Sequence, residues 1–324
     1  FCTQVIFGAG FINSGIDTDN SIHIHFSQED IQYVSAGDFT RISSGKSGTT
    51  TDFGMPELPL YSTMVQVRPD REYEIHFTVL QSSVISDVTV FPFQDESDTE
   101  ISVSIHHLND SFYSGETIYP ESIIHTSERL IMRDLHVLNI QVTPFRFYPN
   151  TRELEIIESL DITVSETEER EYDNPNSRLP SKAFEPLYSN FVVNYETRTR
   201  DEGYQKPAIL YICGGNSENN SAFQQLVNWR HKRGYVVYTA NLSETGSSTG
   251  AIKNYIQDAY ETFDPPPEFI GIFGDVGGTY NVPTFDECWG HDWGGCEGDF
   301  PYTQLDGNDF LPEVFVGRIS VSSS

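Results

Sequence analysis

The stretch Ala208-Ile-Leu-Tyr-Ile-Cys213 decides the fold of the second half of the chain, because it is a continuous apolar run. Such a run is typical of a strand buried on both faces, whereas a strand with one wet face alternates. The stretch Ser221-Ala-Phe-Gln224 follows it and predicts a capping box in which Ser221 is the N-cap and Gln224 reaches back. Gly234 is the expected C-terminal stop of that helix. The sequence therefore predicts a buried strand followed by a helix.

The alternation of strand and helix continues toward the end of the chain. Tyr235-Val-Val-Tyr-Thr239 predicts a second strand, and the cluster Ser247-Ser-Thr249 predicts the cap of a second helix. Phe269-Ile-Gly-Ile-Phe273 and Glu313-Val-Phe-Val316 predict two further strands. Strands that alternate with helices in this way form a parallel α/β sheet with right-handed crossovers.

Residues 1–165 follow a different period. Runs such as Ser21–Phe26, Tyr73–Val79 and Leu154–Val164 alternate between apolar and polar residues, with Gly, Pro, Asn and Asp between the runs. Period-two alternation indicates antiparallel strands with one buried face and one wet face. We expect a β-rich, sandwich-like domain over residues 1–165.

Residues 166–206 separate the two halves. Glu166–Asp173 and Tyr195–Glu202 are rich in charged residues, which is typical of an exposed connector. The middle of the segment, Phe184–Val193, has enough apolar residues to pack somewhere. The predicted organisation is a domain over 1–165, a connector over 166–206 and a truncated α/β subdomain over 207–324.

Charge excludes two classes of partner. The chain has 324 residues with 19 basic and 48 acidic side chains, a formal net charge of −29. A chain this acidic repels phosphate backbones and anionic lipid surfaces, so nucleic acid and such membranes are not expected partners. No apolar run approaches the roughly 20 residues that span a bilayer.

Two of the four cysteines lie close together in the sequence. Cys288 and Cys296 bracket a short loop rich in glycine. This spacing favours a local disulfide in an oxidising compartment, with two unrelated thiols as the alternative. The chain begins at Phe1 with no signal peptide, as a mature secreted protein or an artificially trimmed one would.

Polar residues follow the predicted buried strands, at the edge where open α/β sheets bind ligands. Asp275 follows one strand directly, where it could coordinate, catalyse or cap the next turn. The segment from Asp264 to Glu313 has 11 acids and no Lys or Arg. Oxygen-rich surroundings of this kind suit calcium, a hard cation, although a solvated acidic face would look the same. The candidate ligands are Asp275, Asp306, Asn308 and Asp309.

Cys213 and His231 could form a nucleophile and base pair. The competing interpretation is a core thiol at the end of a buried strand and a surface histidine on a basic helix. The sequence favours this second interpretation.

Several stretches of the sequence resemble the gingipain-type cysteine peptidases, which have a caspase-like fold. The stretch from Tyr302 to Asp309 that runs on to Ser320 is the most specific. The first half resembles the β-rich propeptide of the same family. The other matching stretches are Phe223–Tyr235, Ala251–Gln257 and Phe269–Asp275 in the second half, and Gly54–Pro59 and Tyr148–Leu154 in the first.

The resemblance implies hydrolysis of protein and peptide substrates by a thiolate that histidine activates. In this family the histidine of a His-Gly motif and a later cysteine follow the Gly-Arg-Ile-Ser segment. The chain has no His-Gly pair, so we expect no catalytic residue within it and a dyad beyond residue 324. The expected molecule is a zymogen-type fragment of a bacterial peptidase that is secreted or located at the cell surface.

The resemblance also implies roles for the first half and for calcium. A propeptide assists folding, and blocks the cleft while it is docked on its own catalytic domain. Arg198 and Arg200 are the expected processing sites, unless they belong to an ordinary solvated linker. Calcium is expected as a structural cofactor. The alternative function, in a different class, is a non-catalytic surface or adhesive protein that reuses the scaffold.

Overall fold

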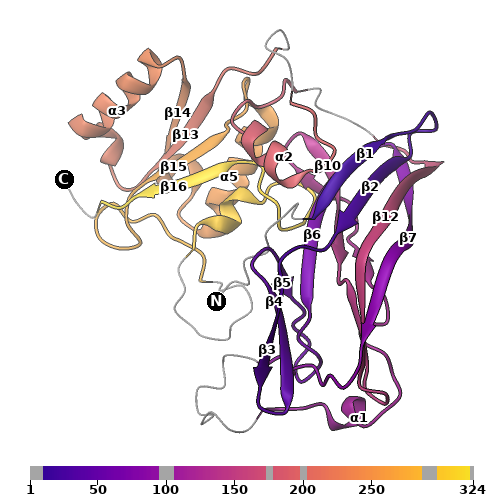
Figure 1. Cartoon of the computed structure of the whole chain (residues 1–324). Helices are drawn as coiled ribbons and strands as arrows, with labels where there is room; N and C mark the ends of the chain where they lie inside the picture. Colours follow the sequence, from indigo (N-terminus) through magenta and orange to yellow (C-terminus); the bar gives the residue numbers. More distant parts are fainter. Residues whose placement is uncertain (1–9, 95–105, 173–177, 198–202, 287–297, 322–324) are drawn as a thin grey trace. The chain divides into compact units, whose positions relative to one another are not determined.

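The chain divides into two compact units. The computed structural model describes residues 10–94, 106–172, 178–197, 203–286 and 298–321 (Figure 1). Because the units interleave along the sequence, the chain passes between them five times. The first unit holds Phe1–Arg129, Val137–Tyr172 and Leu187–Glu196, and the second holds Leu130–His136, Asp173–Pro186 and Thr197–Ser324.

Two sheets form most of the strand-rich part. The strand order in one is β1-β2-β12-β11, with β7 also paired to β12. The order in the other is β5-β6-β10-β8, with β9 paired to β10. The strands of the first sheet are β1 (Phe11–Ile16), β2 (Ile22–Ser27), β7 (Arg71–Ile85), β11 (Phe145–Tyr148) and β12 (Glu153–Glu169). Those of the second are β5 (Gly48–Thr49), β6 (Pro59–Val67), β8 (Ile124–Thr126), β9 (Leu130–Met132) and β10 (Leu135–Val142).

The core of the first unit lies between these sheets. Phe26 of β2 and Leu160 of β12 come from one sheet, and they share an apolar cluster with Val65 of β6 and Ile140 of β10. All four side chains are fully buried. Alternate residues of each strand face inward, as the period of two predicts. The expected β-rich, sandwich-like fold is confirmed.

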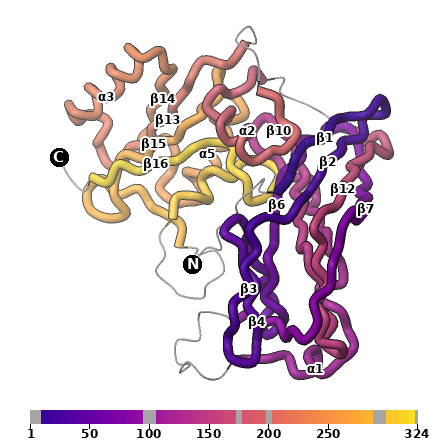
Figure 2. The backbone as a smooth tube through the Cα atoms, viewed as in Figure 1, coloured from indigo at the N-terminus to yellow at the C-terminus, as the bar shows by residue number. Residues whose placement is uncertain are grey.

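Smaller elements complete the strand-rich part. The ribbon of β3 (Ile31–Ala36) and β4 (Phe39–Ser44) lies beside β6, where Ile42 and Leu58 join one apolar cluster (Figure 2). The helix α1 (Asp110–Tyr113) is a single turn capped by Asn109. The segment 166–206 contains the end of β12 and the helix α2 (Glu185–Phe191), and its residues are distributed over both units.

The second unit is built on a parallel sheet of order β14-β13-β15-β16. It confirms the α/β architecture that the buried apolar runs predict. The strands are β13 (Ala208–Cys213), β14 (Val236–Asn241), β15 (Phe269–Phe273) and β16 (Phe315–Ile319). The helical elements are η1 (Ser217–Asn219), α3 (Ser221–Lys232), α4 (Leu242–Thr245), α5 (Thr249–Thr262) and η2 (Phe300–Thr303).

The two long helices cover opposite faces of this sheet. Tyr211 packs with Phe223 of α3, whereas Leu210 packs with Ile252 and Ile256 of α5. Successive residues of β13 thus point into two different cores, because side chains alternate across a strand. This is why the run is apolar at every position.

Two local predictions were wrong by a residue or two. The N-cap of α3 is Asn220, whose side chain accepts from the Ala222 amide, and not Ser221. The last strand begins at Phe315 rather than at Glu313. The cap of α5 falls on Ser248, within the predicted cluster.

In the described part of the chain, no helix combines the length and the apolar character needed to cross a bilayer.

Candidate functional site

The carboxyl ends of the parallel strands lie together at one edge of the sheet. Cys213 pairs in register with Asn241 on one side and with Phe273 on the other, and Phe273 pairs with Ile319. Ligands of open α/β sheets bind beyond this edge. Asp275, two residues after Phe273, is therefore placed where the sequence predicts it.

Glycines let a loop pack closely on this edge. A Cβ atom added to Gly214 or to Gly274 would stand 2.2 Å from the Tyr280 carbonyl oxygen. The loop is closed by the Asp275 amide, which donates to the Tyr280 carbonyl, and by the Val282 amide, which donates to the Asp275 carbonyl. Any larger residue at either glycine would push this loop away.

The Asp275 side chain caps the turn that begins at this residue. Its Oδ1 accepts from the Val276 amide at 2.9 Å, and the residue is half-buried. This is the capping role that the sequence left open beside coordination and catalysis. The second carboxylate oxygen still gives the edge a negative group.

Arg318 of β16 is a functional candidate that the sequence analysis missed. Its guanidinium makes a bidentate pair with Asp299, at 2.8 Å from Nε and 2.6 Å from Nη2. Its Nη1 also donates to the carbonyls of Gly274 and Val282. Arg318 therefore ties the 274–283 loop and Asp299 to the carboxyl edge of the sheet. A charged residue inside an otherwise apolar strand is the signal that could have indicated it.

The Cys213 thiol is fully buried at this edge. Burial raises its pKa to about 12, and the nearby carboxylates of Glu218 and Glu244 contribute. His231 is exposed on α3. These positions agree with a core thiol and a surface histidine rather than with a nucleophile and its base.

The predicted calcium ligands lie in two loops. Asp306, Asn308 and Asp309 belong to one turn, whereas Asp275 belongs to the loop after β15. Asp306 accepts from the Gly307 amide, and Asp309 accepts from the amides of Leu311 and Ile131. These carboxylates organise the backbone.

Within the described part of the chain, no group of three or more His, Cys, Asp or Glu side chains is arranged to hold a metal ion. The calcium site stays a prediction. The predicted disulfide of Cys288 and Cys296 and the processing residues Arg198 and Arg200 lie outside the described residues.

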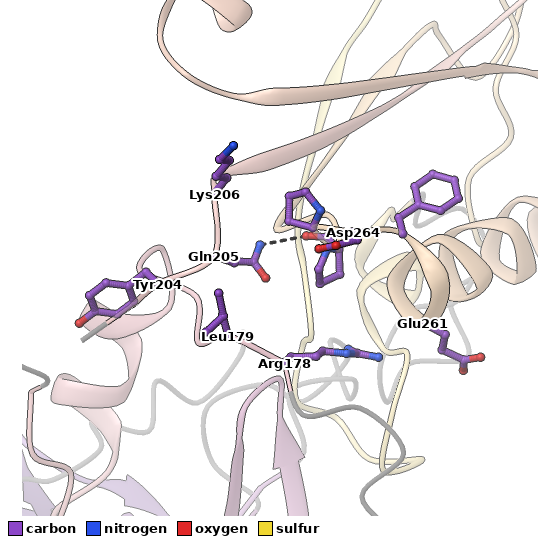
Figure 3. A pocket seen from close by; sticks show the side chains of 10 residues that line it. Arg178, Leu179, Tyr204, Gln205, Lys206, Glu261 and Asp264 are labelled. Atoms are coloured by element: carbon purple, nitrogen blue, oxygen red, sulfur yellow. Dashed lines mark hydrogen bonds between the residues drawn. The ribbon is translucent and has the colours of Figure 1, made fainter. Parts of the chain in front are cut away.

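A pocket of about 770 Å³ lies in the second unit, beside the segments that precede β13 and β15. This is the amino-terminal edge of the parallel sheet, opposite the carboxyl edge described above. Gln205, which precedes β13, projects toward the loop before β15 and donates to the Pro266 carbonyl at 2.9 Å (Figure 3). The pocket is lined by acidic and basic side chains together with aromatic and aliphatic ones. The lining residues are Arg178, Leu179, Tyr204, Gln205, Lys206, Glu261, Phe263, Asp264, Pro265 and Pro266.

The two halves of the chain match two family models in sequence order. The model of the C25 propeptide matches residues 14–201, more than half of the chain, and that of peptidase family C25 matches residues 203–324. The chain belongs to peptidase family C25. It holds the family's propeptide region followed by part of its peptidase region, as the gingipain-type resemblance implies.

Two curated relatives of this C25 chain come from Porphyromonas gingivalis. Gingipain R1 is 25% identical over 275 residues, which cover 83% of this chain and 27% of the relative. Gingipain R2 is 25% identical over 278 residues, which cover 83% of this chain and 36% of the relative. The chain thus spans about a third or less of the length of these relatives.

A solved structure supports the fold. The complex of Porphyromonas gingivalis RgpB pro- and mature domains aligns with a TM-score of 0.50 at 19% identity. The alignment covers 57% of this chain and 97% of that one. The junction between the two C25 regions falls at residues 201–203, next to the predicted processing residues.

Proposed function

We propose that this chain is the propeptide and the first part of the peptidase region of a secreted or cell-surface bacterial cysteine endopeptidase made as a zymogen. The observation that supports it is the order of the matches, propeptide then peptidase, with one junction between them. Because both models belong to a peptidase family, the non-catalytic surface protein is not favoured.

The proposed reaction is hydrolysis of peptide bonds in protein substrates. A histidine takes the proton of a cysteine, the thiolate attacks the carbonyl carbon, and the amine leaves with a proton from the histidine. Water then cleaves the thioester and restores the thiol. The proposed dyad lies beyond residue 324. Cys213 does not suit the role, since burial keeps it protonated.

The proposed activation step is cleavage after Arg198 or Arg200. Both residues lie at the end of the matched propeptide region, next to the junction at residues 201–203. The compact second unit includes the earlier segments Leu130–His136 and Asp173–Pro186. Two segments of the propeptide region thus belong to the same compact unit as the peptidase region. We propose that the propeptide stays docked there until it is removed.

Calcium and the disulfide complete the proposal. We propose structural calcium at the acidic segment that includes Asp275, Asp306, Asn308 and Asp309, and a bridge between Cys288 and Cys296. Isothermal titration with Ca²⁺ tests the first, with an Asp306→Asn, Asp309→Asn variant as the comparison. Non-reducing peptide mapping tests the second.

The decisive experiment uses the full-length protein that contains this chain. We expect hydrolysis of casein only after a cut within residues 198–202, and complete loss of hydrolysis on thiol alkylation. Replacing both Arg198 and Arg200 by Gln should leave the protein uncut and latent. Cleavage that persists after alkylation would exclude a cysteine peptidase.

A further inference from the structure

Arg133 is a buried cation in the second unit, although it belongs to the propeptide region. It occupies the turn between β9 and β10, and only 6% of it is exposed. Its backbone φ is 50°, in the left-handed region that residues with a Cβ atom avoid. An arginine kept at such a position, and buried as well, needs partners that compensate.

The partners of Arg133 precede three neighbouring strands of the parallel sheet. Nη1 donates to the Pro267 carbonyl, before β15, at 3.0 Å and to the Glu313 carbonyl, before β16, at 2.6 Å. Nη2 donates to the Gln205 side-chain oxygen, before β13, at 3.1 Å. One guanidinium thus joins the amino-terminal ends of β13, β15 and β16.

A buried acid and two aromatic rings lie near this cation. Glu268 is 2% exposed, and the Arg133 charge opposes the rise that burial causes in the pKa of Glu268. The rings of Phe184 and Tyr260 each have their centroid 5.4 Å from the guanidinium carbon. The site therefore compensates Arg133 with the Glu268 carboxyl, three hydrogen-bond acceptors and two aromatic rings, and only its Nε has no acceptor among the described residues.

Further bonds join the two sides of the processing junction. The Ile131 amide donates to Asp309 at 2.7 Å, and the Gln205 amide donates to the Pro180 carbonyl at 3.0 Å. The Ser181 hydroxyl donates to Glu268 at 2.5 Å. In each of these bonds one partner precedes residues 198–202 and the other follows them, so cutting there breaks none of them.

We propose that Arg133 anchors the propeptide region to the peptidase region after the chain is cut, with the amino-terminal edge of the parallel sheet as its docking surface. This edge is opposite the carboxyl edge, where ligands of such sheets bind. Arg133 is therefore a positioning residue, and its binding place is separate from the substrate side. The inference deepens the proposed function, since it concerns the same cut.

The test measures retention of the cut propeptide. Residues 198–201 of the full-length protein are replaced by the recognition sequence of an added site-specific protease, so that cutting requires no activity of the protein itself. The dissociation rate of the two pieces is then measured by surface plasmon resonance. Because removing a buried, hydrogen-bonded cation leaves its partners unpaired, Arg133→Met should raise this rate by about 100-fold or more.

Arg129→Met is the matched control. Arg129 also donates to backbone carbonyls, those of Pro69 and Arg71, and all three residues belong to the first unit. We expect its dissociation rate to stay within about threefold of the unchanged protein. Circular dichroism of the uncut proteins establishes that each variant is folded before the cut. If Arg133→Met does not fold, Arg133→Lys replaces it, with an expected increase of about tenfold.

The outcomes separate the anchor from the proposed function. If Arg133 variants release the propeptide no faster than Arg129→Met does, the anchor is refuted, whether or not the protein is a peptidase. If they release it faster and the protein has no thiol-dependent hydrolysis, the proposed function fails and the anchor stands.

Discussion

Ionisation of the buried Glu313 carboxyl lowers the free energy of unfolding. Its Oε2 accepts from the Leu305 amide at 2.6 Å and the Asp306 amide at 3.1 Å, and no described residue donates to its Oε1. Burial raises its pKa to about 8, from an ordinary value of 4.5, and the charges of Asp309 and Asp306 contribute. The folded protein therefore keeps this carboxyl protonated at pH values where the unfolded chain ionises it.

This gives a pH dependence of stability with a definite sign. A carboxyl with a raised pKa stabilises the fold fully below pH 4.5, and that stabilisation is lost as the pH rises to about 8. Glu313→Gln removes the ionisation, so it should flatten the loss, which amounts to several kcal/mol at most. Urea unfolding between pH 5 and 8.5 measures it. The exposed Glu261→Gln variant is the control, and parallel curves for all three proteins would contradict the assignment.

Cys213 should be inert toward alkylation while the protein is folded. With a pKa of about 12, roughly one thiol in 10⁵ is ionised at pH 7. Burial also denies the reagent access. Iodoacetamide followed by peptide mapping should label Cys213 only after denaturation. Labelling of the folded protein within minutes would mean that the end of β13 opens.

At the scale of elements, the close approach between two strand ends and one loop is the feature most open to test. Gly274→Ala places a Cβ atom 2.2 Å from the Tyr280 carbonyl oxygen, so the 274–283 loop must move. We expect a loss of about 1–3 kcal/mol in unfolding free energy.

Gly250→Ala on α5 is the comparison, because nothing lies within 4 Å of its added Cβ atom. This change should be neutral or stabilise by up to about 1 kcal/mol. Thermal unfolding of both variants measures the difference. Equal melting temperatures would show that the loop moves without cost.

The elements themselves were predictable to different degrees. Continuous apolar runs indicated β13 and β15 because those strands are covered on both faces. The start of α3 was misplaced because Asn220 and Ser221 are adjacent and both are good caps. Arg318 was missed because its partners, Asp299 and the 274–283 loop, are brought to it only by the parallel pairing of β15 and β16.

At the scale of the whole molecule, the division into units could not be predicted. The change of period near residue 165 separates strand-rich from α/β sequence, yet Leu130–His136 belongs to the second unit. Nothing around Arg133 in the sequence distinguishes it from a surface arginine. Its partners before three strands lie 72 to 180 positions away along the chain, so only the fold reveals them.

The division predicts that the peptidase region depends on the preceding half in order to fold. Without that half, Glu268 loses the cation beside it, the carbonyls of Pro267 and Glu313 lose their donor, and Phe315 loses Phe184, whose ring centroid lies 4.5 Å from its own. Uncompensated buried carboxylates are costly. The full-length peptidase region produced from residue 203 onward should therefore be insoluble or lack a near-ultraviolet dichroism signal.

Supplying residues 1–197 as a separate chain during synthesis should restore folding, whereas the same piece with Arg133→Met should restore much less. The Arg129→Met piece serves as the matched control and should restore folding as well as the unchanged piece does. A peptidase region that folds alone with an unchanged melting temperature would refute the dependence. In that case the buried acids at the amino-terminal edge must be satisfied by groups within the peptidase region itself.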